Sequence, residues 1–159
     1  MMITKTIKRK GALPPNYFKL TLKEAFALEK KCLELLNTHF ECICGFECNH
    51  FPLLKNYNEN KLRLHMTYCG KSLDKSGFKD VVIKNLDQQL KCITFNMKKA
   101  GVMHRDMHRS GKNLCVNNDG IVSVIDFDIA KIGNVSDEYC INFENKMKQI
   151  IKSKRIKTD

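Results

Sequence analysis

The residues best suited to chemistry gather between positions 102 and 130. His104-Arg105-Asp106 comes first, Asn113 follows, and Asp126-Phe127-Asp128 ends the stretch. Carboxylate and amide oxygens are hard ligands of the kind that magnesium takes, and a further carboxylate can accept the proton of an attacking hydroxyl. Together, such groups suit chemistry that depends on a divalent metal ion and moves a proton.

The hairpin follows from the turn chemistry. Two apolar, β-branched runs, 113–116 and 121–125, flank Asn117-Asn118-Asp119-Gly120. Asn and Asp followed by Gly favour a tight turn between strands, because these residues tolerate positive φ. The pattern therefore predicts a hairpin that carries Asn113 at its start and Asp126 just after its end.

Other elements must position these groups. Thr21 and Glu24 form the pattern of a capping box, and helical spacing of apolar residues predicts a helix from there to Asn37. Alternation predicts a strand over 61–68, and a second helix is predicted from Asp80 to Ala100, closed by Gly101. The strand pattern over 3–8 and a helical pattern over 136–159 complete the expected elements.

In this order, the elements and motifs resemble the protein-kinase-like superfamily, and in particular Ser/Thr protein kinases, over roughly residues 20–130. The resemblance implies an α+β, protein-kinase-like fold with a reduced small lobe and a truncated helical large lobe. We expect residues 1–159 to form a single truncated domain. Its parts would be a partial small lobe over 1–68, a hinge over 69–73 and a partial large lobe over 74–159.

The resemblance also implies roles in catalysis. Asp106 would accept or orient the proton of the attacking hydroxyl, and His108 would contact the γ-phosphate. Asn113 and Asp126 would hold Mg²⁺.

For the nucleotide, the resemblance implies a lysine that contacts the α- and β-phosphates of ATP and is oriented by Glu29. Two lysines remain open for this role, Lys8 by the strand pattern and Lys10 by its distance from Glu29. Met66 takes the gatekeeper place, the backbone of Thr67 and Cys69 would meet the adenine edge, and Cys115 would lie on the pocket floor.

Three features depart from the family pattern. Asp106 and Asn113 are seven positions apart where the family has five, so we expect an insertion that displaces Asp106 from the metal site. Asp128 stands where the family has glycine, and no glycine-rich phosphate loop precedes the first helix.

The cysteine residues bear on the cellular compartment and on a possible metal site. Eight cysteines, with neither a secretory signal nor a long apolar stretch, indicate a reducing, intracellular and cytoplasmic setting without membrane insertion. Cys42, Cys44, Cys48 and His50 have zinc-binding side chains, but their spacing is tighter than that of usual structural zinc sites. We expect free thiols there, with zinc as the alternative.

Three functions are compatible with the sequence. The first is an ATP- and magnesium-dependent phosphotransferase that acts on a protein or a small molecule. The second is a pseudokinase or decoy that binds and regulates a complete kinase. The third is nucleic-acid binding through basic ends, since the chain has a formal net charge of +11.

Overall fold

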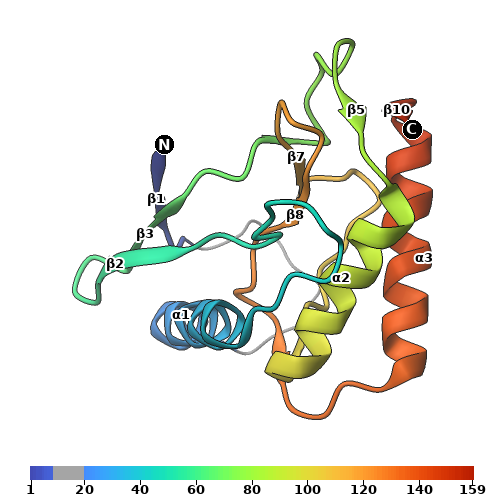
Figure 1. The fold of residues 1–159 in the computed structure, drawn as a ribbon. Helices are drawn as coiled ribbons and strands as arrows, with labels where there is room; N and C mark the ends of the chain where they lie inside the picture. The colour runs from blue at the N-terminus through green and yellow to red at the C-terminus, as the bar shows by residue number, and fades with distance from the viewer. Residues whose placement is uncertain (9–19) are drawn as a thin grey trace.

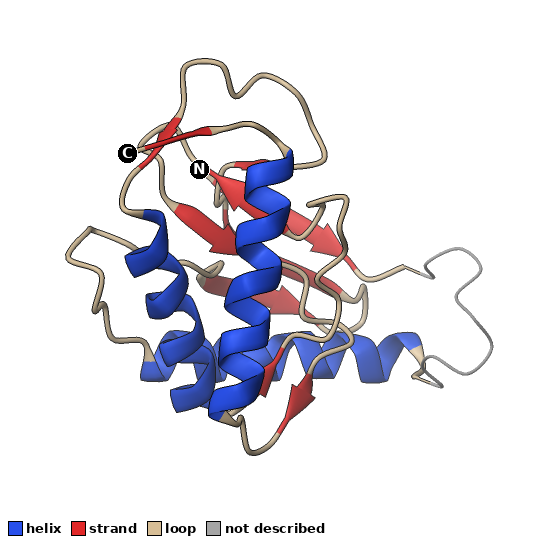
Figure 2. Ribbon diagram, turned by 90° about the vertical axis from the view of Figure 1, so that its right-hand side faces the viewer, coloured by secondary structure: helices blue, strands red, loops and turns tan. Residues whose placement is uncertain are grey.

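The computed structural model describes residues 1–8 and 20–159, which form a mixed α+β structure (Figures 1 and 2). Three helices span Leu22–His39 (α1), Leu86–Ala100 (α2) and Asp137–Ser153 (α3). The strands are β1 Met2–Thr6, β2 Leu54–Asn58, β3 Arg63–Thr67, β4 Lys71–Ser72, β5 Val82–Ile83, β6 Val102–Met103, β7 Leu114–Val116, β8 Val122–Val124, β9 Lys131–Ile132 and β10 Lys157–Thr158.

The first sheet joins the start of the chain to its middle. Its order is β1-β3-β2, and both pairings are antiparallel. Ile3 lies opposite Met66, and Lys5 lies opposite Leu64. Helix α1 lies next to this sheet in Figure 1 and contacts β2. The predicted strand at 61–68 is confirmed as β3.

Helix α1 begins as the capping box predicts. The Thr21 hydroxyl accepts from Glu24 N–H, and the Glu24 carboxylate accepts from Thr21 N–H. The helix runs past Asn37, its expected last residue, to His39. The Asn37 side chain donates to Pro52 O at 3.0 Å and accepts from Leu54 N–H at 2.9 Å, so it ties the following loop to the helix.

The second sheet contains the predicted hairpin. Strands β7 and β8 are antiparallel, with Leu114 opposite Val124, and β4 pairs with the other edge of β7. At the turn, the Asn117 side chain accepts from the backbone N–H groups of Asp119 and Ile121. The hairpin prediction is confirmed.

Helix α2 starts later than the sequence pattern predicts. Residues 82–83 form β5, which pairs in parallel with β10 near the end of the described chain. Asn85 then adopts a left-handed conformation before the helix, and its N–H donates to the Asp159 carboxylate at 2.7 Å. The end of α2 is as predicted, because Gly101 closes it with φ 72° and donates to Lys98 O.

One apolar core connects these parts. Helices α2 and α3 lie side by side, running in opposite directions in Figure 1, and their buried faces join those of α1 and both three-stranded sheets. Phe51, Phe127, Leu33, Met97 and Met147 are among its most deeply buried side chains. None of the helices in the described residues is long and apolar enough to cross a bilayer.

Candidate functional site

Three charged side chains from distant parts of the chain meet beside the first sheet. Lys5 Nζ on β1 lies 2.8 and 2.7 Å from the two oxygens of Glu29 on α1. The same ammonium lies 2.6 Å from Asp126 Oδ1, just beyond β8. Glu29 is almost fully buried and also accepts from Phe127 N–H at 3.3 Å. The cluster therefore ties β1, α1 and the segment after the hairpin together.

Lys5 is the lysine that the sequence interpretation missed. Among the described residues it pairs with Glu29, whereas Lys8 lies beyond the end of β1 and is exposed. Lys10 lies outside the described residues. Strand alternation contains the signal: Ile3, Lys5 and Ile7 share one face of the strand, and Lys8 belongs to the other. Ile7 is buried, and Ile3 and Lys5 line the cavity described below.

The charges in this cluster depend on one another. Burial lowers the pKa of Lys5, but the attraction of Glu29 and Asp126 outweighs it, so the pKa lies above its ordinary value. Burial raises the pKa of Glu29, and Lys5 opposes that rise. Lys5 is therefore the cation that allows carboxylates to be packed together here. Oxygens of Glu29, Asp126 and Asp128 all lie within 4.8 Å of one another.

The loop between β6 and β7 brings Asp106 to Asn113 despite its extra length. Asn113 Nδ2 donates to Asp106 O at 2.7 Å and to Asp106 Oδ2 at 3.2 Å. The lengthened stretch packs against the end of β4, where Leu73 N–H donates to Gly111 O and the Ser72 hydroxyl donates to Lys112 O. A turn absorbs the extra residues, and Asp106 stays hydrogen-bonded to Asn113. The expected displacement of Asp106 from the metal site stays a prediction.

His104 holds this loop against the segment after β8. Its Nε2 lies 2.7 Å from Ile125 O, and its Nδ1 accepts from Asp106 N–H at 3.1 Å. The His104 ring packs edge-on against Phe127, with ring centroids 4.9 Å apart. The buried imidazole thus sets the position of Asp106 relative to Asp126, which adopts a left-handed backbone with φ 72°.

A cavity of about 560 Å³ lies between the first sheet and the hairpin. That volume is within the range of small-molecule and cofactor sites, about 300–1,000 Å³. Lys5, Glu29, Asn113 and Asp126 line it. The predicted nucleotide contacts line it too, namely Met66, Thr67, Cys69 and Cys115.

Away from the Lys5 cluster, the lining combines uncharged residues with three further lysines, Lys71, Lys75 and Lys112. Met66 and Cys115 are buried, and burial raises the pKa of the Cys115 thiol to about 12 and that of Cys69 to about 11. Both thiols are therefore neutral at physiological pH. A flat apolar ligand can lie between these walls while its charged end faces Lys5.

His108 takes no part in the lining of the cavity. It is exposed, and its Nδ1 accepts from Ser110 N–H at 3.0 Å within the lengthened loop. Of the predicted site residues that the structure describes, Lys8 and His108 lie apart from the cavity, and Asp106 reaches it through Asn113.

A cation and two groups that can bind metal line one cavity, and a carboxylate, that of Asp106, is hydrogen-bonded to one of these groups. Such an arrangement can bind a polyphosphate with a divalent ion and orient a hydroxyl near it. Comparison with protein-family models and with curated proteins finds no match.

Proposed function

We propose that this chain is a reduced member of the protein-kinase-like superfamily and transfers the γ-phosphoryl group of ATP to a hydroxyl, with Mg²⁺. The observation that carries this proposal is the junction of Lys5, Glu29 and Asp126 in the wall of the 560 Å³ cavity. These side chains come from β1, α1 and the end of the hairpin, so a purely local packing need does not explain their meeting. Asn113 lines the same cavity, and its side chain donates to Asp106.

The adenine would lie against the segment from Met66 to Cys69. Thr67 N–H donates to Leu53 O at 3.0 Å, and Leu53 N–H donates to the Thr67 hydroxyl at 2.9 Å. The Thr67 carbonyl accepts a long contact from the Cys69 thiol, at 3.9 Å. A carbonyl oxygen has two lone pairs, so it can also accept from the exocyclic amine of adenine.

The phosphates and the metal would lie at the charged wall. Asp126 and Asn113 would hold Mg²⁺ through oxygen atoms, since the amide nitrogen of Asn113 is already used by Asp106. A bound Mg²⁺ would neutralise part of the negative charge of the phosphates. Lys5, with a raised pKa, is a permanent cation for the phosphate oxygens.

Asp106 would handle the hydroxyl proton. Its carboxylate lies 3.2 Å from Asn113 Nδ2, which places a proton acceptor beside the proposed metal ligand. The His104 ring fixes the Asp106 backbone through a buried contact. His108 is exposed on the loop, so we assign it no contact with the phosphates in this structure.

The test is transfer of labelled γ-phosphate from ATP to generic protein and small-molecule hydroxyl acceptors, with Mg²⁺ or Mn²⁺. Wild type should transfer or hydrolyse ATP, and Asp106→Asn should lose at least 100-fold of that rate while binding ATP normally. Arg109→Gln in the same loop is the matched control and should keep the rate. Absence of turnover in wild type would overturn the proposal, whether or not ATP binds.

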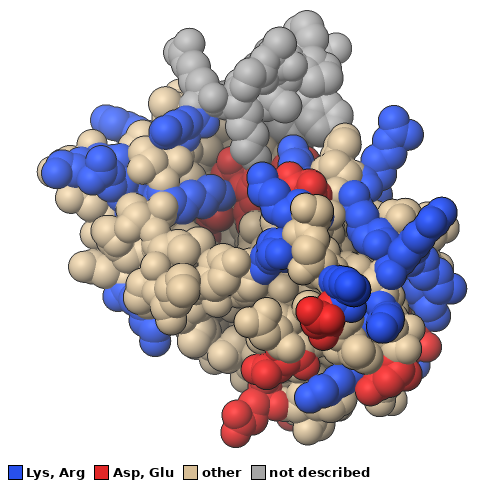
Figure 3. Space-filling model, turned by 90° about the horizontal axis from the view of Figure 1, so that it is seen from above, with Lys and Arg blue, Asp and Glu red and all other residues tan. Residues whose placement is uncertain are grey.

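The regulatory alternative has a distinct outcome in the same assay. A pseudokinase would bind ATP without turnover, and its capture of a complete kinase would be insensitive to Asp106→Asn. Nucleic-acid binding has its own readout, a salt-dependent shift of labelled DNA. Lys and Arg gather in separate groups on the face in Figure 3, with acidic groups between them, and they do not form a single basic stripe there.

A further inference from the structure

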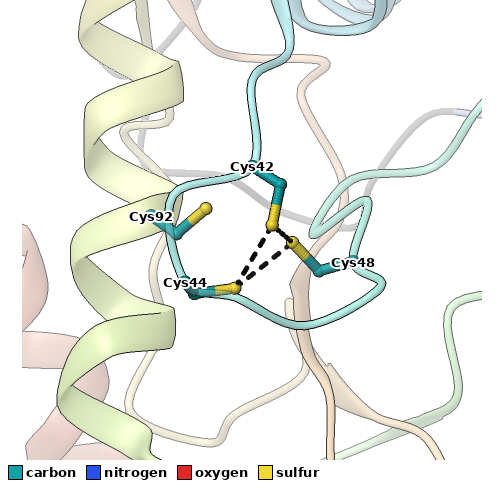
Figure 4. A group of neighbouring side chains, drawn as sticks. All are labelled: Cys42, Cys44, Cys48 and Cys92. Atoms are coloured by element: carbon teal, nitrogen blue, oxygen red, sulfur yellow. Dashed lines mark hydrogen bonds between the residues drawn. The ribbon is translucent and has the colours of Figure 1, made fainter.

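Four cysteine sulfurs meet on the side of the molecule where the loop after α1 passes α2 (Figure 4). Three belong to the loop, Cys42, Cys44 and Cys48, and the fourth is Cys92 in the middle of α2. All four sulfurs lie within 4.8 Å of one another. None is in a disulfide, because all eight cysteines of the chain are free.

The distances suit a single tetrahedral ion. The sulfur atoms are 3.7 Å apart for Cys42 and Cys44, 3.3 Å for Cys44 and Cys48, and 3.0 Å for Cys42 and Cys48. Four thiolates around zinc at about 2.3 Å have sulfurs about 3.8 Å apart. A small outward movement of the loop sulfurs would therefore reach that geometry.

The loop backbone makes the tight spacing workable. Residues two positions apart in an extended chain share a side but lie about 6.6 Å apart, which is why Cys42 and Cys44 look unsuited to one ion in sequence. Here residues 44–47 bend, and Gly45 adopts φ 79° with open space around it. The bend turns the loop sulfurs towards a common centre (Figure 4).

The surroundings of Cys92 are those of a metal-bound sulfur. Its Sγ accepts from Ile43 N–H at 3.4 Å and lies 3.6 Å from Asn96 Nδ2. N–H donors around a sulfur stabilise negative charge on it and orient it as a ligand. Asn96 is itself buried and held by Cys92 O and Glu41 O, so these donors are fixed.

We propose that Cys42, Cys44, Cys48 and Cys92 bind one structural Zn²⁺, which releases the thiol protons to solvent. The expected set in the sequence had His50 in place of Cys92. His50 Nε2 lies 3.5 Å from Cys44 Sγ, and its Nδ1 lies 2.6 Å from Val122 O, so His50 connects the cluster to β8.

The ion would stabilise the elements that carry the wall of the cavity. It would fasten the 42–48 loop to α2, and the loop continues through His50, whose carbonyl accepts from Val124 N–H at 2.8 Å. Strand β8 leads directly to Asp126. A closed set of four protein ligands leaves no open position, so this ion would be structural and distinct from the proposed magnesium.

The test is the metal content of protein produced with zinc and purified under reducing conditions without chelator. Wild type should carry one zinc per chain, and Cys92→Ser and Cys48→Ser should carry less than a tenth of that. Cys140→Ser, a half-buried thiol on α3, is the control and should keep the zinc. A chelator should lower the Tm of wild type and leave that of Cys92→Ser unchanged.

Two further measurements test the ligand set without the cysteine variants. Wild type loaded with Co²⁺ should show the absorption of a tetrahedral thiolate site, and His50→Ala should keep one zinc. Loss of zinc in His50→Ala with retention in Cys92→Ser would overturn the ligand set. A wild-type protein without zinc, or one whose mass shows a Cys42–Cys48 disulfide under these conditions, would overturn the site.

Discussion

Replacement of Lys5 by methionine tests the charged cluster on which the site depends. Methionine keeps much of the apolar stem but removes the ammonium that lies 2.7 Å from Glu29 and 2.6 Å from Asp126. Glu29 would then be a buried carboxylate beside two others, without the cation that Lys5 provides. Removal of one partner from a buried ion pair costs about 3–5 kcal/mol.

The lower end of that range applies here, because the Lys5 side chain is 27% exposed. We therefore expect the free energy of unfolding to fall by about 3 kcal/mol. For a chain of this length each kcal/mol moves the Tm by about 2–4 °C, so the Tm should fall by about 6–12 °C. Thermal and urea denaturation measure both quantities, and Lys8→Met, which removes an exposed lysine, should change them little.

The loss should depend on pH in a defined direction. The folded-state pKa of Glu29 is raised above its ordinary value of 4.5, and removal of Lys5 raises it further. A raised carboxyl pKa destabilises the fold as pH rises through it. The stability gap between wild type and Lys5→Met should therefore be widest at neutral pH and narrow as pH falls towards 4.5. An equal Tm for both proteins at neutral pH would refute the reasoning.

The remaining predictions concern the catalytic loop and a turn. Asp106→Asn should leave the Tm within about 2 °C of wild type, because the amide replaces a half-buried carboxylate in the same shape. Gly120→Ala should lower the free energy of unfolding by about 2 kcal/mol or more, since a Cβ there would lie 2.0 Å from Val82 O. Gly45 has nearly the same φ but open space around it. A smaller loss of unfolding free energy in Gly45→Ala than in Gly120→Ala would therefore show that the clash, and not the backbone angle, causes the difference.

Local signals were enough for the hairpin and for α1. Turn residues and a capping box act within a few positions, so the sequence displays them directly. The start of α2 was mispredicted because Val82 fits a helical apolar pattern as well as a strand. Val82 is in a strand because it pairs with Lys157. The residues around Val82 in the sequence do not indicate a partner so far along the chain.

The candidate site follows the same division. Asp106, Asn113 and Asp126 were named from the motifs that carry the family resemblance, and the structure brings Asp106 to Asn113 beside the cavity that Asp126 lines. Lys5 was missed because the strand pattern was taken to favour Lys8 and the distance along the chain from Glu29 was taken to favour Lys10. Cys92 was missed because it lies on a helix far in sequence from the other cysteines, where only packing brings it near.

Binding of ATP with and without Mg²⁺, measured by titration calorimetry on wild type and Asp126→Ala, tests the central claim most directly. We predict saturable binding to wild type with one ATP per chain, tightened at least tenfold by Mg²⁺. Asp126→Ala should lose the magnesium effect, because Asp126 is a proposed ligand of the ion. Wild-type protein that binds no ATP, or that binds it equally with and without Mg²⁺ in both proteins, would contradict the account.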